Sequence, residues 1–227
     1  TGVQTCALPI YALILIFAGS ETSASTLTNA MMFLGLNPTW WNKLKEEQEK
    51  LRLEHGDALT PQQLEAAQAP LLDAVLKESL RMRTVIGGIP RKTLEDIEVD
   101  GVVIPKGWLI DPSMLLTHEE DPACKLENGE HLDAIKGFHP ERWLLGSEFE
   151  KPTSDWYVPY GFGPRYCLGK NLAQLEMKIF LATMVRKIEL PKLQMAPKGY
   201  YDEVSGGSIQ TTNSDKYFPV EWNKIGR

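Results

Sequence analysis

Apolar residues recur with the period of an α-helix over much of the chain, and polar stretches separate these segments. Residues 11–35 are apolar nearly all round at first, which predicts a buried helix, since a surface helix keeps a polar face. Residues 39–54 are charged and predict a solvated helix that begins in the turn of Pro38. The pattern therefore predicts a mainly helical fold.

Two further stretches predict helices with one apolar face. Residues 69–82 are amphipathic. Their core face is expected at Leu72, Val75, Leu76, Ser79 and Leu80. A buried helix is expected to start just after Cys167 and to end at Leu190-Pro191. Its apolar positions are Leu168, Leu172, Leu175, Ile179 and Ala182.

Shorter segments predict small peripheral β-sheets around the helices. Residues 97–104 form a hairpin pattern around Asp100-Gly101, and a third strand is expected over residues 108–110. Residues 199–222 predict a terminal hairpin. Residues 119–137 are polar and predict a surface loop in which Cys124 has no evident partner. Just before it, His118 is interpreted as a packing residue in a short helix, not as a ligand.

The first helix carries unexpected residues at its centre, Ala18-Gly19-Ser20-Glu21-Thr22-Ser23. Gly costs about 1 kcal/mol relative to Ala inside a helix, so the approach of a ligand or close packing should offset it. The alternative is a helix crossing at Gly19, with the Thr22 hydroxyl bonded back to a carbonyl.

The most distinctive stretch is Pro-Tyr-Gly-Phe-Gly-Pro-Arg-Tyr-Cys-Leu-Gly-Lys, residues 159–170. Gly161, Gly163 and Pro164 predict a tight loop with little side-chain bulk. Cys167 follows at the expected start of a helix, where the helix dipole favours a thiolate, and Arg165 can lie on the same side. This combination suits a flat anionic ligand with a soft metal at its centre, which describes haem. The alternative is a buried or nucleophilic cysteine.

This stretch resembles the haem-binding loop of the cytochrome P450 family, Phe-Gly-x-Gly-x-Arg-x-Cys-x-Gly. The matching residues are Gly161, Gly163, Arg165, Cys167 and Gly169, with Tyr160 in place of Phe. The resemblance implies that Cys167 is the axial iron ligand and that Arg165 pairs with a haem propionate. It also implies a second propionate partner at Arg91, which by itself is typical of a strand-edge arginine.

Three further segments resemble motifs of the same family, in the same order. Residues 18–23 are similar to its oxygen-binding helix, Ala/Gly-Gly-x-Asp/Glu-Thr-Thr/Ser, which implies that Glu21 and Thr22 deliver protons during dioxygen activation. Glu78 and Arg81 match its Glu-x-x-Arg helix, and residues 138–143 match its Pro-Glu-Arg-Phe element with Trp143 for Phe. The resemblance implies a buried Glu78–Arg81–Arg142 network. In isolation Glu78 and Arg81 would be interpreted as a surface pair.

Composition narrows the function further. The 227 residues carry a net charge of −6 without a dense basic run, which argues against nucleic acid as a partner. Cys6, Cys124 and Cys167 are too few and too scattered for a disulfide framework or a zinc site. No uninterrupted run of about 20 apolar residues is present. Residues 1–10 differ in character from the rest of the chain and are interpreted as a non-native leader or assembly scar.

The resemblance implies that residues 11–227 are the C-terminal part of a single haem monooxygenase domain, mainly α with small peripheral β-sheets. It implies haem b as cofactor and electrons from NAD(P)H through a flavoprotein reductase or a ferredoxin. It also implies an apolar substrate such as a sterol, a retinoid or another isoprenoid. The parent protein is expected at the endoplasmic reticulum or another intracellular membrane, with or without an anchor in it, or else in the cytoplasm. The chain alone is expected to be inactive. The alternatives are a haem-thiolate isomerase or dehydratase acting on hydroperoxides, and a non-catalytic haem-binding module.

Overall fold

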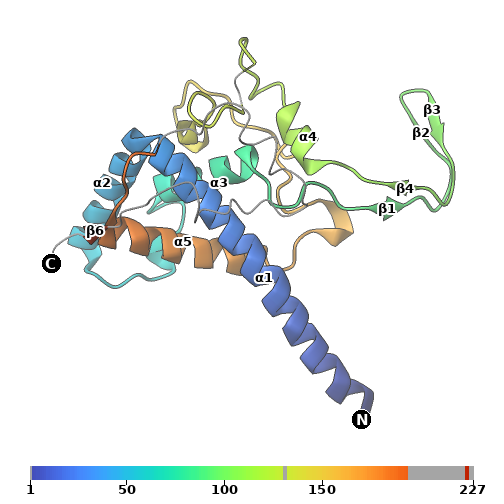
Figure 1. The fold of residues 1–227 in the computed structure, drawn as a ribbon, viewed down its shortest axis with the longest axis horizontal. Helices are drawn as coiled ribbons and strands as arrows, with labels where there is room; N and C mark the ends of the chain where they lie inside the picture. The colour runs from blue at the N-terminus through green and yellow to red at the C-terminus, as the bar shows by residue number, and fades with distance from the viewer. Residues whose placement is uncertain (1, 130–131, 194–222, 225–227) are drawn as a thin grey trace.

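The computed structural model describes residues 2–129, 132–193 and 223–224, and within them the chain is mostly helical (Figure 1). The longer helices are α1 (Gly2–Leu36), α2 (Pro38–His55), α3 (Pro70–Met82) and α5 (Lys170–Lys187), and α4 (Met114–Glu119) is short. Three 3-10 turns complete the helical segments: η1 (Gln62–Leu64), η2 (Pro140–Trp143) and η3 (Gly163–Arg165). The predicted fold class, mainly α with small sheets, is confirmed.

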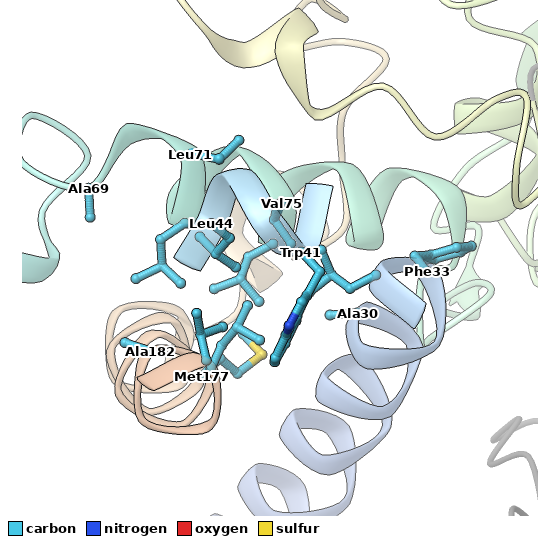
Figure 2. Close-up of a cluster of buried hydrophobic side chains, with 14 of the residues drawn as sticks. Ala30, Phe33, Trp41, Leu44, Ala69, Leu71, Val75, Met177 and Ala182 are labelled. Atoms are coloured by element: carbon cyan, nitrogen blue, oxygen red, sulfur yellow. The ribbon is translucent and has the colours of Figure 1, made fainter. Parts of the chain in front are cut away.

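The core lies where the C-terminal half of α1 meets α2, α3 and α5 (Figure 2). The helix α3 is the most enclosed element, and all five of its predicted core residues are buried. Phe33 of α1 stacks on Phe138 with ring centroids 4.9 Å apart, which joins the core to the segment before η2. Pro38 and Pro70 occupy the first turns of α2 and α3, where the missing N–H costs no helical hydrogen bond.

The helix α1 starts earlier than the pattern predicts, at Gly2 and not at Tyr11, so residues 2–10 continue it. Its N-terminal half extends away from the other elements (Figure 1), and residues 13–17, expected to be buried, are exposed. From Pro9 to Leu36 the helix is long and apolar enough to cross a membrane, because Glu21 is its only charged residue. Length and composition alone are a weak indication, since a core helix passes the same criterion.

Two of the sheets, built from β1 to β4, form a narrow arm that projects from the helices (Figure 1). The hairpin of β2 (Ile97–Val99) and β3 (Val102–Ile104) turns at Asp100 and Gly101, which both have positive φ, as predicted. The third strand predicted over residues 108–110 is present, but it does not join that hairpin. The strand β4 (Leu109–Ile110) pairs instead with β1 (Arg91–Lys92), because the chain returns alongside its own entry into the arm. Finally, β5 (Ile188–Glu189) pairs with β6 (Asn223–Lys224), and the predicted hairpin over residues 199–222 lies outside the described residues.

Of two further predictions about burial, one is wrong and the other holds in part. In α5 the buried residues are Met177, Leu181, Ala182 and Val185, whereas Leu168 is 95% and Leu172 is 63% exposed. The face of α5 that packs against the core is therefore the one that carries residues 177, 181 and 185. The described residues of the 119–137 segment form a mostly exposed loop, as predicted, but Asp121 and Cys124 in it are buried. Cys124 has a partner after all, since Nη1 of Arg142 donates to its Sγ at 3.4 Å.

Candidate functional site

The loop from Val158 to Gly169 is held by its own backbone hydrogen bonds. The N–H of Gly161 donates to the carbonyl of Val158 at 2.9 Å, and the N–H of Cys167 donates to the carbonyl of Tyr160 at 2.9 Å. Gly161 and Gly163 have φ of 76° and 62°, in the left-handed region that favours glycine. The loop therefore folds back on itself and fixes Cys167 close to Tyr160.

One side of this loop is open. Residues 162–168 are all exposed, and Cys167 is a free cysteine. A Cβ added at Gly163 would meet no atom within 4 Å, whereas one at Gly161 would lie 3.4 Å from Cδ1 of Ile89. Arg165, two residues before Cys167 in the sequence, is also exposed. The loop thus offers a thiol, a cation and bare backbone on an accessible surface.

Cys167 lies slightly further from the following helix than predicted. The first helical residue of α5 is Lys170, with Gly169 as its N-cap. The helix therefore begins two residues later than predicted, because Leu168 and Gly169 form a turn before the first helical residue. Since the effect of the helix dipole falls off within the first turn, it acts on Cys167 more weakly than predicted.

Arg91 is brought to the same region through its neighbours. It begins β1, and its Nη1 donates to the carbonyls of Ile89 and Pro90 at 3.3 and 3.1 Å. Ile89 packs against Gly161, so the segment before β1 covers one flank of the Cys167 loop. Ile89 thus links Arg91, two residues further along the chain, to Gly161 of the loop.

Glu21 and Thr22 lie in the middle of α1. Glu21 is exposed, and Oγ1 of Thr22 donates to the carbonyl of Ala18 at 2.7 Å, the back-bond that the sequence allows as an alternative. In the part of the chain that the structure describes, neither residue bonds to the Cys167 loop. No atom lies within 4 Å of a Cβ added at Gly19, so a helix crossing does not explain this glycine.

A cavity of about 930 Å³ lies between α1 and α5. Its lining includes Gly19, Ser20 and Ser23 from α1 and Leu172 and Phe180 from α5. Gly19, Ser20 and Ser23 belong to the motif of residues 18–23, so this apolar cavity adjoins that part of the predicted site, whereas Thr22 and Cys167 do not line it. Sequence reasoning missed it, because the apolar pattern places the exposed face of α5 in the core.

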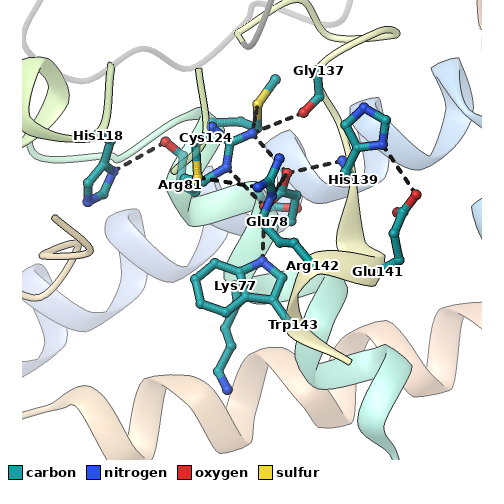
Figure 3. Close-up of polar contacts among 12 residues, drawn as sticks. Lys77, Glu78, Arg81, His118, Cys124, Gly137, His139, Glu141, Arg142 and Trp143 are labelled. Atoms are coloured by element: carbon teal, nitrogen blue, oxygen red, sulfur yellow. Dashed lines mark hydrogen bonds and ion pairs between the residues drawn. The ribbon is translucent and has the colours of Figure 1, made fainter. Parts of the chain in front are cut away.

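The Glu78–Arg81–Arg142 network is present and buried, as predicted (Figure 3). Nη2 of Arg81 donates to Oε1 of Glu78 at 2.8 Å, and Nε of Arg142 donates to the same oxygen at 3.2 Å. Burial alone would raise the pKa of Glu78, but the two guanidinium groups and the hydrogen bonds outweigh it and hold this pKa below its usual value. The carboxylate is therefore ionised and structural.

Sequence reasoning missed two donors to Glu78 and one histidine. The indole N–H of Trp143 donates to Oε2 of Glu78 at 2.9 Å, and the backbone N–H of His139 donates to Oε1 at 3.0 Å. His118 is buried as a packing residue, as predicted, but it also bonds to Arg81 and Val158. Backbone partners leave no trace in the residue pattern, so only the indole of Trp143 could have been suspected.

Comparison with known proteins gives a consistent result. The family model described as "Cytochrome P450" matches residues 8–213. Among curated proteins, the chain is 34% identical over 171 residues to 3beta,22alpha-dihydroxysteroid 3-dehydrogenase of Arabidopsis thaliana, covering 75% of this chain and 34% of that protein. It is also 34% identical over 190 residues to the mitochondrial sterol 26-hydroxylase of Homo sapiens, covering 81% and 33%.

A solved structure, "Retinoic acid bound cyanobacterial CYP120A1", is similar with a TM-score of 0.66 and 35% identity. The similarity covers 78% of this chain and 38% of that one. The chain thus spans about a third of the length of the curated relatives that it matches.

Proposed function

Because the chain belongs to the cytochrome P450 family, we propose that the protein that carries it is a haem-thiolate monooxygenase. It inserts one oxygen atom of dioxygen into an apolar substrate and releases the other as water, with two protons and with two electrons that originate from NAD(P)H. The single observation that carries this proposal is the Cys167 loop, in which an exposed thiol and the exposed Arg165 lie two residues apart, next to open space at Gly163.

The residues of this loop fit haem. The open space at Gly163 would accept a flat macrocycle near the backbone, and a thiolate is a soft ligand suited to its iron. Cys167 would hold the metal as the axial ligand. Arg165 and Arg91 would pair with the two propionates, and Gly161, Gly163 and Gly169 would keep the loop free of bulk. When bound, thiolate-ligated haem supplies the activation of dioxygen and the oxidation of the substrate.

Glu21 and Thr22 are proposed to hold and move protons on the side of α1. The exposed carboxyl of Glu21 can exchange protons with water. In this structure the hydroxyl of Thr22 donates its hydrogen bond to the carbonyl of Ala18. To donate a proton during the reaction, Thr22 must break this hydrogen bond and form one to the reacting group. While its hydrogen is bonded to Ala18, the hydroxyl oxygen of Thr22 can still accept a hydrogen bond through its lone pairs.

The substrate class proposed is a sterol, a retinoid or another isoprenoid. The names of the relatives refer to a steroid, a sterol and retinoic acid, and this supports an apolar polycyclic or polyene substrate. The electron donor is proposed to be a flavoprotein reductase or a ferredoxin, and the site of action an intracellular membrane. A polypeptide of these 227 residues alone is proposed to be inactive, because residues 13–17 leave a large apolar surface exposed.

The proposal is tested by the carbon monoxide difference spectrum of the reduced, haem-loaded full-length protein and of its Cys167→Ser variant. We expect the red-shifted band of thiolate ligation in the wild type and its loss in the variant. A wild type without this band contradicts the proposal. Rapid turnover of hydroperoxides without NAD(P)H would favour an isomerase or dehydratase instead, and a change of iron ligand on reduction would favour a sensing module.

A further inference from the structure

We propose that His118 is a positioning residue for the Cys167 loop, which it holds through the backbone amide of Val158. The inference rests on the proposed function only in that Cys167 is taken as the iron ligand. His118 does not belong to any motif that the sequence resemblance supplied. Its role follows from two hydrogen bonds, its burial and the place of α4 in the fold.

The two ring nitrogens of His118 bond to different segments of the chain. Nε2 lies 2.9 Å from the backbone nitrogen of Val158, and Nδ1 lies 3.2 Å from the carbonyl oxygen of Arg81 (Figure 3 shows the Arg81 contact). Since the amide of Val158 can only donate, Nε2 must accept. Nδ1 therefore carries the proton and donates it to Arg81. The neutral Nδ1–H tautomer satisfies both partners.

A continuous chain of backbone contacts leads from His118 to Cys167. The amide of Val158 donates to His118, and the carbonyl of Val158 accepts from Gly161. The residue before Gly161 is Tyr160, and its carbonyl accepts a hydrogen bond from the amide of Cys167. On its other side, His118 bonds to the carbonyl of Arg81, and Arg81 is held in place by the buried ion pair with Glu78. His118 thus connects the most enclosed helix of the described chain to the first residues of the loop.

The opposite end of α4 holds the other flank of the same loop. The amides of Met114 and Leu115 donate to the carbonyl of Gly87 at 2.8 and 3.3 Å. Two residues further, Ile89 packs against Gly161. The short helix α4 therefore contacts both the first residue of the loop, Val158, and the segment that covers the loop. His118 is the side chain that makes the contact with Val158.

The surroundings of His118 favour a geometric role over proton transfer. The ring is 1% exposed and stacks on Tyr157, with centroids 5.6 Å apart. Burial is the largest influence on the imidazole and lowers its pKa to about 4. The charge of Arg81 acts in the same direction, whereas Asp121 and the carbonyl of Arg81 oppose it. The ring is therefore neutral near pH 7, and protonation of Nε2 would remove the acceptor for Val158.

A pair of amide substitutions separates the two bonds. In His118→Gln the amide oxygen reaches the place of Nε2, so Val158 keeps an acceptor. In His118→Asn the shorter side chain places its amide N–H only where Nδ1 was. The hydrogen bond to the carbonyl of Arg81 is therefore kept, and the amide of Val158 loses its acceptor. His139→Asn is the matched control, because His139, although only partly buried, also bonds to a carbonyl at 2.8 Å and stacks on an aromatic ring, but it has no hydrogen bond to Val158.

The first measurement is hydrogen exchange of the Val158 amide in the full-length protein, with and without haem. We expect a protected amide in the wild type and in His118→Gln, and exchange faster by about tenfold or more in His118→Asn. Nitrogen-15 spectra should show the Nδ1–H tautomer of His118. A wild-type Val158 amide that exchanges as fast as an exposed one, or an Nε2–H tautomer, overturns the proposal even if a variant fails to fold.

The second measurement is the fraction of thiolate-ligated carbon monoxide complex in the haem-loaded full-length enzyme. We expect a several-fold rise of the form without thiolate ligation in His118→Asn, recovery in His118→Gln and no change in His139→Asn. Equal thiolate fractions in both His118 variants overturn the positioning role. A wild type that lacks the thiolate band refutes the proposed function instead, and leaves the exchange result to decide the Val158 contact.

Discussion

Trp143 donates its indole N–H to Oε2 of Glu78 at 2.9 Å, so the carboxylate receives a hydrogen bond from a position at which the family motif has phenylalanine. The same indole ring packs against Tyr157, with centroids 4.7 Å apart. This chain therefore adds a neutral donor to a buried charge that two arginines already neutralise.

The first prediction concerns this donor. Trp143→Phe keeps the ring contact but removes the hydrogen bond, and we expect a loss of about 1–2 kcal/mol in the free energy of unfolding, because a bond to a buried charge is lost. Urea denaturation of the full-length protein measures it. Trp108→Phe is the control, since Trp108 is exposed on the β arm. Equal stability of wild type and Trp143→Phe would show that the bond contributes nothing.

The second prediction concerns Glu78 itself. Glu78→Ala leaves Arg81 and Arg142 buried without their carboxylate, and we expect a cost of about 3–5 kcal/mol. Thermal or urea unfolding and the yield of haem-loaded protein measure the effect. Glu49→Ala is the matched control, because Glu49 and Arg52 have the same three-residue spacing on an exposed helix face and should contribute little. Equal effects of the two substitutions would contradict a structural role for the network.

The third prediction compares glycines with the same backbone conformation. Gly161, Gly163 and Gly146 all have positive φ, so each Gly→Ala change should destabilise the protein by about 1–2 kcal/mol. Only the changes at Gly161 and Gly163 should also weaken haem binding, since their Cβ atoms would lie on the loop that is proposed to contact haem. Haem titration of the three variants tests this. Wild-type haem affinity in Gly163→Ala would show that haem does not approach that backbone.

The fourth prediction is a pH dependence of stability. Because the pKa of His118 is about 4 in the folded chain against 6.5 ordinarily, the unfolded chain binds the proton more readily. The contribution of neutral His118 is complete above pH 6.5 and is lost as the pH falls toward 4. By about pH 5 it should have decreased by about 2 kcal/mol, or 1.5 pH units at 1.36 kcal/mol each.

Urea unfolding of wild type and His118→Asn at several pH values between about 4 and 8 isolates this contribution. The difference in stability between them should shrink as the pH falls, because the carboxylates that titrate in the same range are common to both proteins. A difference that stays constant across this range would mean that His118 does not titrate with a lowered pKa.

The fifth prediction concerns proton delivery by Thr22. In the full-length enzyme with its reductase, Thr22→Ala should keep haem but divert electrons to peroxide, which lowers the product formed per NAD(P)H consumed. Thr28→Ala is the matched control, because the hydroxyl of Thr28 makes the same back-bond within α1, to Ala24 at 2.9 Å. If both variants couple electrons to product as the wild type does, Thr22 is an ordinary helix residue.

The features predicted well from the sequence depend on spacing within one element. The core face of α3, the pairing of Glu78 with Arg81, and the turn at Asp100-Gly101 all follow from positions three, four or one apart. The contribution of Arg142 is implied by the motif that it shares with the family. The site residues in the Cys167 loop are also local, and their roles stay predictions.

The features that sequence reasoning missed depend on contacts between distant segments. The pairing of β4 with β1 is decided by backbone groups, which every residue carries. The buried face of α5 could not be chosen from its pattern, because apolar residues occupy both the core side and the cavity side of this helix. The pattern gives no specific contacts for Cys124 and His118, because their partners are arginine and backbone groups far away in sequence.

Arg142 and Glu78 are 64 positions apart in the sequence, and this separation has a consequence for synthesis on the ribosome. At about 5–20 residues per second, Glu78 is made about 3–13 s before Arg142 exists. During that interval Arg142 is absent, so burial of the Glu78 carboxylate costs more free energy than in the complete network. Arg81, made three residues later on the same helix, is then the one network cation within reach. It can keep α3 neutral at this site until the distant arginine emerges.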